Sequence, residues 1–394
     1  MDGKRGAAEG GRFVAGDPLR GIASMAVILF HYGLGSVLGN LGTGSYAAYD
    51  EGFGPVIGRF IMHLDIGLYV FFALSGYLLF RPMVRAFALG ERQPRIGPYA
   101  RNRFLRIVPV FWVVFVLTLL AYGTRDSSFW EIIAVPLFIQ QYVGGEFQGT
   151  IGQAWTLDTE MQFYIFLPLF GLLLFAVLGA RVKHKALFAL GVLVGVFVLS
   201  MVVRVGGWTG LTYERTLPAA LSLFVPGLML AALEQWAPAR LTPRAARRWS
   251  FGLLIVALLG FVWYASVPVE RLFWRAVFAC MISGGFVGAA LVLEWARLPS
   301  PRILDNRVTQ WIGSRSYPLY LLHGGIALKI LLVAEDFSGV WTWFAVIAAI
   351  SLPLTFLSAE LLHRWVERPM MRLRATPRAA VDRRQAEAAL VPGP

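Results

Sequence analysis

Ten long apolar runs constrain the fold of this chain more than any other feature of its sequence. A helix needs about 20 mostly apolar residues to cross a bilayer. Runs of this kind recur along the chain near residues 19–38, 66–81, 106–123, 160–179, 186–205, 216–234, 250–267, 272–293, 316–334 and 341–363. Backbone polar groups inside a bilayer must be satisfied within the structure, which helices achieve. The sequence therefore predicts an all-α, polytopic integral membrane protein with about ten transmembrane helices.

The composition of the chain agrees with this prediction. Of its 394 residues, 57% are hydrophobic and only 15% are charged, whereas soluble domains carry about 25% charged residues. A net charge of +13 would suggest a nucleic-acid partner for a soluble protein. In a membrane protein, the positions of the basic residues matter more than their number, so we expect no nucleic-acid partner. Cys280 is the only cysteine, which excludes an internal disulfide, a thiolate zinc site and an iron–sulfur cluster.

Arginine and lysine are distributed very unequally between the two sides of the predicted spans. If the N-terminus is cytoplasmic, the cytoplasmic side receives seven arginines from Arg81 to Arg106 and seven more from Arg364 to Arg384. The opposite side keeps only Arg59, Arg125, Arg204, Arg215, Arg271 and Arg275. Cytoplasmic loops carry an excess of basic residues. We therefore predict a multi-pass protein of the cell membrane with both termini in the cytoplasm.

The chain divides into one large membrane domain and two short flanking segments. We predict a cytoplasmic N-terminal segment over 1–16, a transmembrane domain over 17–374 and a disordered cytoplasmic tail over 375–394, which has little to bury. The connection 39–65 is rich in glycine and small residues, which favours irregular structure. The run 131–143 is too short to span and is expected to be re-entrant or interfacial.

The first span contains two ionisable residues. Inserting an ionisable side chain near the bilayer centre costs about 2.5–3.5 kcal/mol, so such residues usually have a function. His31 lies deep in this span, and Arg20 precedes it by eleven residues. On a helix this spacing places both on one face, about 16 Å apart. The plain alternatives are a hydrogen-bonded histidine without chemistry and an arginine that only anchors the topology.

A basic pair opens the third span, in the stretch RNRFLRIVPVFW. Arg103 and Arg106 are three residues apart and share a helix face. Paired guanidiniums suit phosphate oxygens, which they can bind bidentately. The alternative is again that the pair serves only the membrane topology.

Three further polar residues, Glu160, Tyr164 and His323, are candidates for a catalytic or binding role. Glu160 opens the fourth predicted span and shares a helix face with Tyr164. A carboxylate at a helix N-terminus is also a common cap, and this explanation fits Asp158 better. His323 is a second deep imidazole, for which a structural hydrogen bond and a functional role are equally open. Ser75, next to Gly76 in FFALSGYLLF, is interpreted as a small residue for helix packing.

Six stretches in order resemble signatures of the integral-membrane acyltransferase family 3. DPLRGIASMAVILFHYG is similar to the family's opening Leu-Arg-Gly with its Arg-x10-His spacing, and RNRFLRIVPVFW carries its basic pair. WTLDTEMQFYIFLPLF resembles its Trp-Ser-Leu-x-x-Glu-x-Gln-Phe-Tyr block, with Thr156 replacing the serine. FFALSGYLLF, SYPLYLLH and HRWVERPM resemble the remaining signatures. The resemblance runs from about residue 17 to 372, and Tyr69 stands where many members have an acidic residue.

The resemblance implies a membrane-embedded O-acyltransferase of the cell envelope. It would move an acyl group, acetyl by default, from acyl-CoA to a hydroxyl of a carbohydrate or glycosylated acceptor. No extracytoplasmic hydrolase-like domain follows the membrane part, so we expect the membrane unit or a partner to handle the acceptor. No metal is expected.

The resemblance also assigns roles to the candidate residues. Arg20, Arg103 and Arg106 would bind the phosphates of acyl-CoA. His31 would remove the proton from the acceptor hydroxyl, and Glu160 would orient or charge-balance His31. Substrate binding or stabilisation of the oxyanion would fall to Tyr164 and His323. The alternative function is a proton-coupled small-molecule transporter that uses the same intramembrane His and Glu residues, although the sequence lacks the internal repeats that many transporters show.

Overall fold

A computed structural model describes residues 13–124, 127–143, 152–178, 181–206, 214–235, 241–268, 270–334 and 337–374. These residues form helices and connections, with no β-strand among them. Ten helices in the described part are long and apolar enough to cross a membrane, which confirms the predicted number. The protein is thus an all-α, multi-pass membrane protein. Residues 1–12 of the predicted N-terminal segment, and the whole predicted tail 375–394, lie outside the described residues.

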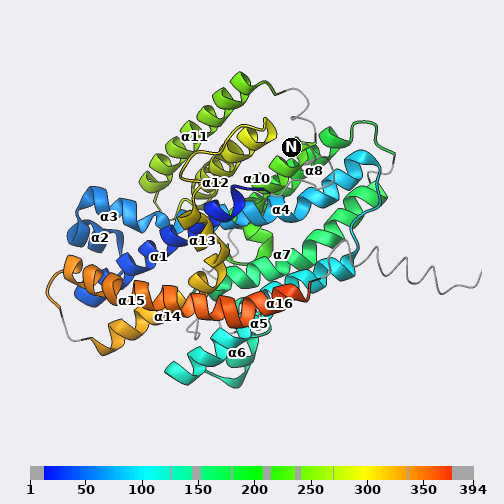
Figure 1. Ribbon diagram of the computed structural model, residues 1–394. Coiled ribbons are helices and arrows are strands. Elements are labelled where there is room, and N and C mark those ends of the chain that lie inside the picture. Colours follow the sequence, from blue (N-terminus) through cyan, green and yellow to red (C-terminus); the bar gives the residue numbers. More distant parts are fainter. Residues whose placement is uncertain are drawn as a thin grey trace, which may run out of the picture.

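The ten long helices are connected by short elements (Figure 1). The long helices are α1 (Gly16–Leu41), α4 (Gly67–Leu89), α5 (Ile96–Tyr122), α7 (Trp155–Leu172), α8 (Lys185–Val205), α10 (Leu217–Glu234), α11 (Pro243–Ser266), α12 (Leu272–Trp295), α14 (Ser316–Val333) and α15 (Val340–Leu362). The short helices are α2 (Tyr46–Phe53), α3 (Pro55–Met62), α6 (Phe129–Ala134), α13 (Arg307–Ser314) and α16 (Arg368–Arg372). Single helical turns lie at Leu64–Ile66, Gln140–Tyr142, Gly152–Ala154, Leu173–Leu178 and His363–Glu367.

Successive long helices run in opposite directions, which defines two faces of the molecule. Helices α1, α5, α8, α11 and α14 begin at one face, and α4, α7, α10, α12 and α15 end there. The stretches that hold most of the basic residues, such as 81–106 and 297–315, connect helices at this face. We call it the arginine-rich face and the other one the opposite face.

Helices α1 and α4 lie at the centre of the bundle. Helix α1 packs against α13, α14 and α15, whereas α4 packs against α10 and α12. Figure 1 shows α11 and α12 along one flank, and α14 and α15 along another, with α1 and α4 between them. Helix α7 contacts α4, α5 and α10. The site described below therefore forms where segments far apart in the sequence meet.

Glycine allows α4 and α10 to approach closely. A Cβ atom on Gly227 of α10 would lie 1.8 Å from the carbonyl oxygen of Ala73 in α4. A Cβ atom on Gly76 would lie 2.5 Å from the carbonyl oxygen of Phe224. Small residues permit such contacts between membrane helices. The glycine beside Ser75 therefore does have the packing role that the sequence suggested for this part of the span.

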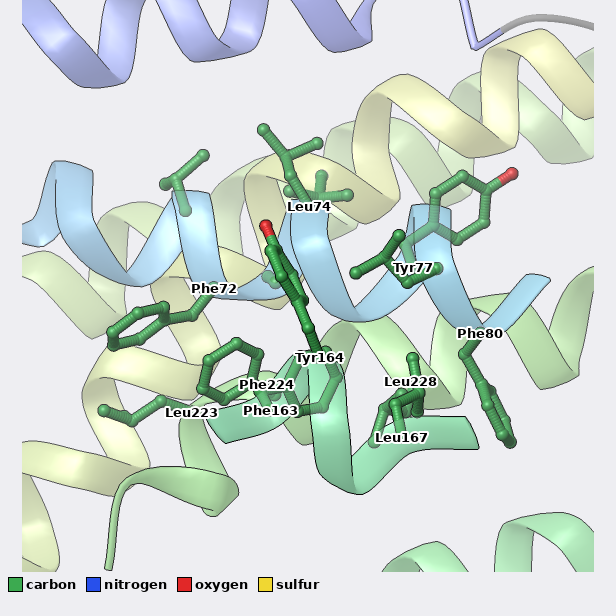
Figure 2. Packing of buried hydrophobic residues seen from close by; sticks show 14 of the residues in the cluster. Phe72, Leu74, Tyr77, Phe80, Phe163, Tyr164, Leu167, Leu223, Phe224 and Leu228 are labelled. Carbon is green, nitrogen blue, oxygen red and sulfur yellow. The ribbon is translucent and has the colours of Figure 1, made fainter. Parts of the chain in front are cut away.

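A stack of aromatic rings joins α4, α7 and α10 next to this contact (Figure 2). The rings of Phe72 and Phe224 stack at a centroid distance of 4.4 Å, and those of Phe224 and Phe163 at 4.1 Å. Figure 2 shows the Tyr164 ring rising from α7 with its hydroxyl beside α4. Aromatic pairs contribute about 0.5–1.5 kcal/mol each beyond the burial of their surface area. The stack thus fixes α7 against α4.

The prediction of irregular structure over 39–65 was wrong, because α2 and α3 form within this connection. Ser45 caps α2, since its side chain accepts a hydrogen bond from the backbone N–H of Ala48. Gly54 adopts φ +82°, and Pro55 then begins α3. Glycine and proline here separate two short helices instead of preventing them. The segment 131–143 lies outside the ten candidate spans, as predicted, and contributes part of α6 and a single turn.

Candidate active site

A cavity lies between α1, α4, α5, α7 and α14, and it contains most of the predicted site residues. Its empty volume, counting the part that is open to solvent, is about 730 Å³. We call it the inner cavity. Its polar lining comprises Arg20, Ser75, Arg103, Arg106, Thr156, Glu160, Tyr164, Ser316, Tyr317 and Tyr320. Leucine and phenylalanine side chains of α4 supply much of the apolar lining.

Three arginines from two helices line this cavity on the side of the arginine-rich face. Arg20 of α1 pairs with Asp17 at 3.2 Å and lies within electrostatic range of Arg106 and Glu160. Arg103 of α5 lies over the Tyr164 ring, 5.9 Å from its centroid, and its buried Nε has no hydrogen-bond partner. Like charges repel, so an arrangement of this kind is stabilised by an anion. The structure thus brings together the three arginines that the sequence singled out.

A fourth arginine joins this group, and it was not among the residues predicted from sequence. Arg374 follows α16, which packs against α5. Burial first, and then the guanidiniums of Arg106 and Arg103, lower the pKa of Arg374 from its usual value to about 10. Its buried Nε and one terminal nitrogen have no hydrogen-bond partner. In the sequence Arg374 is one of many basic residues near the C-terminus, and only the packing of α16 distinguishes it.

Glu160 is held in the cavity wall by two hydroxyl groups. The Ser75 hydroxyl donates to Glu160 Oε1 at 2.5 Å, and the Tyr164 hydroxyl donates to the same oxygen at 2.5 Å. The shared helix face of Glu160 and Tyr164 is thus confirmed. Helix α7 begins at Trp155, so Glu160 lies in its second turn and does not cap it. Ser75, interpreted from sequence as a packing residue only, also makes a polar contact in this cavity.

His31 and His323 contact each other although 292 residues separate them. His31 Nδ1 lies 2.9 Å from the carbonyl oxygen of Val27, and His323 Nδ1 lies 3.2 Å from that of Leu319. A carbonyl only accepts hydrogen bonds, so we assign the proton of each neutral ring to Nδ1. His323 Nε2 then accepts a second hydrogen bond from the same His31 Nδ1–H, at an Nδ1–Nε2 distance of 3.2 Å. This arrangement leaves the His31 Nε2 lone pair without a proton, as a base requires.

The histidine pair lies one layer behind the wall of the inner cavity. His323 is fully buried, and neither ring is among the cavity lining. The Tyr320 ring lines the cavity and lies 5.7 Å from the His323 ring, while its hydroxyl contacts Thr156 Oγ1 at 2.6 Å. Tyr320 thus connects the pair to the cavity. Tyr320 was not among the predicted site residues, although it lies in SYPLYLLH, three residues before His323.

No hydrogen bond joins Glu160, the candidate for orienting or charge-balancing His31, to that histidine among the described residues. The bonds of Glu160 go to Ser75 and Tyr164, whereas those of His31 go to Val27 and His323. Glu160 lines the inner cavity, whereas His31 does not. No group of three His, Cys, Asp or Glu side chains in the described part of the chain could hold a metal ion.

Comparison with known proteins shows the family. The sequence matches an acyltransferase domain, that of acyltransferase family 3, over residues 16–360. This chain belongs to that family. The family consists of enzymes that transfer acyl groups, and the match covers α1 through nearly all of α15.

Named relatives are similar over most of this chain. The peptidoglycan O-acetyltransferase OatA of Listeria monocytogenes is 25% identical over 90% of the chain. A Bacillus subtilis protein named "Putative peptidoglycan O-acetyltransferase YrhL" is 24% identical over 91% of the chain. The chain spans about half (55%) of the length of both relatives. No solved structure matches the chain.

Proposed function

We propose that this protein is an O-acetyltransferase that takes its acyl group from acyl-CoA at the arginine-rich face. The observation that carries the proposal is the inner cavity, which Arg20, Arg103 and Arg106 line together with one carboxylate, Glu160, and near which Arg374 lies. Coenzyme A carries a pyrophosphate and a 3′-phosphate. Guanidiniums bind such groups with charge-assisted, bidentate hydrogen bonds. The family and the names of the relatives support acetyl transfer to a carbohydrate.

The distance along α1 fits the shape of this donor. Arg20 and His31 are eleven residues apart on one helix, which corresponds to about 16 Å. The pantetheine arm of coenzyme A is long and thin, and it would carry the thioester over this distance while the phosphates stay with the arginines. The excess of basic residues on the arginine-rich face supports a cytoplasmic location of that face and of both termini. Acyl-CoA would then enter from the cytoplasm.

In the proposed reaction His31 acts as the general base. Its Nε2 accepts the proton of the acceptor hydroxyl as the hydroxyl oxygen attacks the thioester carbonyl. A C–O bond forms, the C–S bond breaks, and the proton passes from His31 to the leaving thiolate, so the products are the ester and free coenzyme A. His323 positions His31, because His323 Nε2 accepts a hydrogen bond from the Nδ1–H of the His31 ring. Glu160, with Ser75 and Tyr164, would orient the substrates at the cavity wall.

The test is thiol release from acetyl-CoA by the purified protein in the presence of a soluble peptidoglycan fragment. Wild-type protein should release thiol only when both substrates are present. His31→Ala should abolish glycan-dependent release and leave binding of acetyl-CoA intact. The matched control is His184→Ala, which changes an exposed histidine at the arginine-rich face. Unchanged turnover in His31→Ala would refute the assignment of the base.

A further inference from the structure

A second cavity opens at the opposite face of the molecule. It lies where α4 and α7 begin and α8 ends, and α12 also contributes to its wall. Its empty volume is about 1230 Å³, larger than that of the inner cavity. We call it the outer cavity. Its polar and aromatic lining includes Asp65, Tyr69, Trp155, Arg204, Arg215 and Arg275.

The outer cavity concentrates charge on a face that has little of it. The sequence places only six arginines on this side of the membrane, and three of them line this cavity. The same lining holds three carboxylates, those of Asp65, Glu214 and Glu270. Formal charges are thus balanced here, in contrast to the inner cavity. A balanced set of donors and acceptors fits an uncharged ligand that both gives and accepts hydrogen bonds.

The side chains of this cavity are held in place by contacts with one another. The Arg275 guanidinium lies 4.0 Å from the Tyr264 ring centroid and 4.0 Å from Asp65 Oδ2. The Tyr264 hydroxyl donates to Asp65 Oδ2 at 2.8 Å and contacts the Tyr69 hydroxyl at 2.9 Å. Arg204 pairs with Glu214 at 3.6 Å, and its buried Nε has no hydrogen-bond partner. Such fixed polar groups are typical of a pre-formed binding site.

Aromatic rings accompany these polar groups. Trp155 and Tyr69 both line the outer cavity and are half-buried. The Arg215 guanidinium lies over the Trp155 ring, 5.0 Å from its centroid. Aromatic side chains offer an apolar surface next to polar groups. A sugar ring matches this combination, because it presents hydroxyl groups around its edge and C–H groups on its faces.

The two cavities share a wall. Trp155 lines the outer cavity, and the next residue of α7, Thr156, lines the inner one. On α4, Tyr69 lines the outer cavity while Phe72, one turn later, lines the inner one. Thr156 contacts Tyr320, which leads to the histidine pair. A ligand in the outer cavity is therefore separated from the inner site by about one helical turn.

We propose that the outer cavity is the binding site for the acceptor, an uncharged polyhydroxylated glycan that enters from the face opposite to the donor. The proposal rests on the proposed transferase function and adds the place and the side at which the acceptor binds. Donor and acceptor then approach the shared wall from opposite sides of the membrane, close to Thr156 and Tyr320. Arg215 and Trp155 bind the glycan and take no part in proton transfer.

The first arm of the test measures steady-state kinetics with acetyl-CoA and chitotetraose, a soluble oligomer of N-acetylglucosamine. We expect Arg215→Ala and Trp155→Leu each to raise the acceptor KM at least tenfold and to leave the donor KM within twofold of wild type. The matched control is Arg271→Ala, which changes an exposed arginine on the same face outside the cavity. An unchanged donor KM shows that each variant is folded.

The second arm measures binding without turnover. In a Cys280→Ser background, which removes the native thiol, Arg215→Cys is labelled with a membrane-impermeant maleimide. Chitotetraose should slow the labelling at least fivefold, and acetyl-CoA should leave its rate unchanged. Protection by chitotetraose in a protein that never releases thiol would refute the proposed transferase function and retain the glycan site. Turnover with an unchanged acceptor KM in both variants and no protection would overturn the glycan site and retain the transferase.

Discussion

The inner and outer cavities differ most in their balance of charge. Three arginines and a single carboxylate, Glu160, line the inner cavity, and Arg374 lies close to those arginines. The outer cavity has as many carboxylates as arginines. Membrane topology alone explains an excess of arginine on one face, but it does not explain why three of the six arginines of the other face gather in one cavity. The difference indicates that each cavity is matched to a chemically distinct substrate.

The comparison also separates binding from chemistry. The histidine pair belongs to neither cavity lining and lies behind Tyr320. Substitutions in one cavity should therefore change the KM of one substrate, whereas substitutions of the histidines should change kcat alone.

The largest effect is expected for the proposed base. His31→Ala should lower kcat by about 100- to 10,000-fold, the usual contribution of general acid–base catalysis, and leave the KM of each substrate within a few-fold of wild type. Initial rates of thiol release over both substrate concentrations measure this. His184→Ala is the control and should behave as wild type. A change confined to one KM would place His31 in a binding site instead.

The next largest effect concerns the arginines of the inner cavity. Arg106→Ala and Arg374→Ala should each raise the donor KM by about 10- to 100-fold, because a hydrogen bond to a charged group contributes about 1.5–3 kcal/mol. The acceptor KM should stay unchanged. Arg101→Ala and Arg372→Ala are matched controls, since Arg101 is exposed on the same helix as Arg106 and Arg372 is exposed two residues before Arg374. An equal rise of the acceptor KM would contradict the assignment of this cavity to the donor.

A smaller effect is expected for His323 as a positioning residue. His323→Gln retains an acceptor for the His31 Nδ1 proton, whereas His323→Leu removes it. We expect kcat to fall about tenfold in the Leu variant and to be partly restored in the Gln variant, with both KM values unchanged. Equal activity of the two variants would indicate that His323 only fills space.

The smallest effect is a difference in salt dependence. Raising the ionic strength from about 0.05 M to 0.5 M shortens the range of electrostatic attraction. The donor KM should rise several-fold, because the inner cavity attracts anionic phosphates. The acceptor KM of chitotetraose should stay constant, because that ligand is uncharged. A parallel rise of both values would remove the proposed contrast between the cavities.

Much of the fold follows from the sequence, because the bilayer imposes a length and a composition on each span. The number of spans and the all-α class are examples. The connection 39–65 was predicted incorrectly, since the local capping by Ser45 and the turn at Gly54 outweigh the glycine content. The predicted limits of the spans also differ from those in the structure. The fourth span, predicted to begin at residue 160, begins at Gly152.

The site was predictable where it lies on one helix and unpredictable where it joins several. Arg103 with Arg106, and Glu160 with Tyr164, follow from helical periodicity. Helical periodicity does not predict which helices pack against one another. The contact of His31 with His323, the bond from Ser75 to Glu160, and the approach of Arg374 to α5 all depend on tertiary packing.

Transfer of an acetyl group between two substrates on opposite sides of a membrane tests most directly whether donor and acceptor bind at opposite faces. Inverted membrane vesicles expose the arginine-rich face, if that face is cytoplasmic as proposed. Acetyl-CoA with a labelled acetyl group is added outside vesicles that contain chitotetraose in their lumen. We predict that the labelled acetyl group appears on the lumenal glycan and that His31→Ala vesicles show none. In a parallel reaction chitotetraose is added outside the vesicles instead. Label on that external glycan and none on the lumenal glycan would contradict the placement of donor and acceptor on opposite faces.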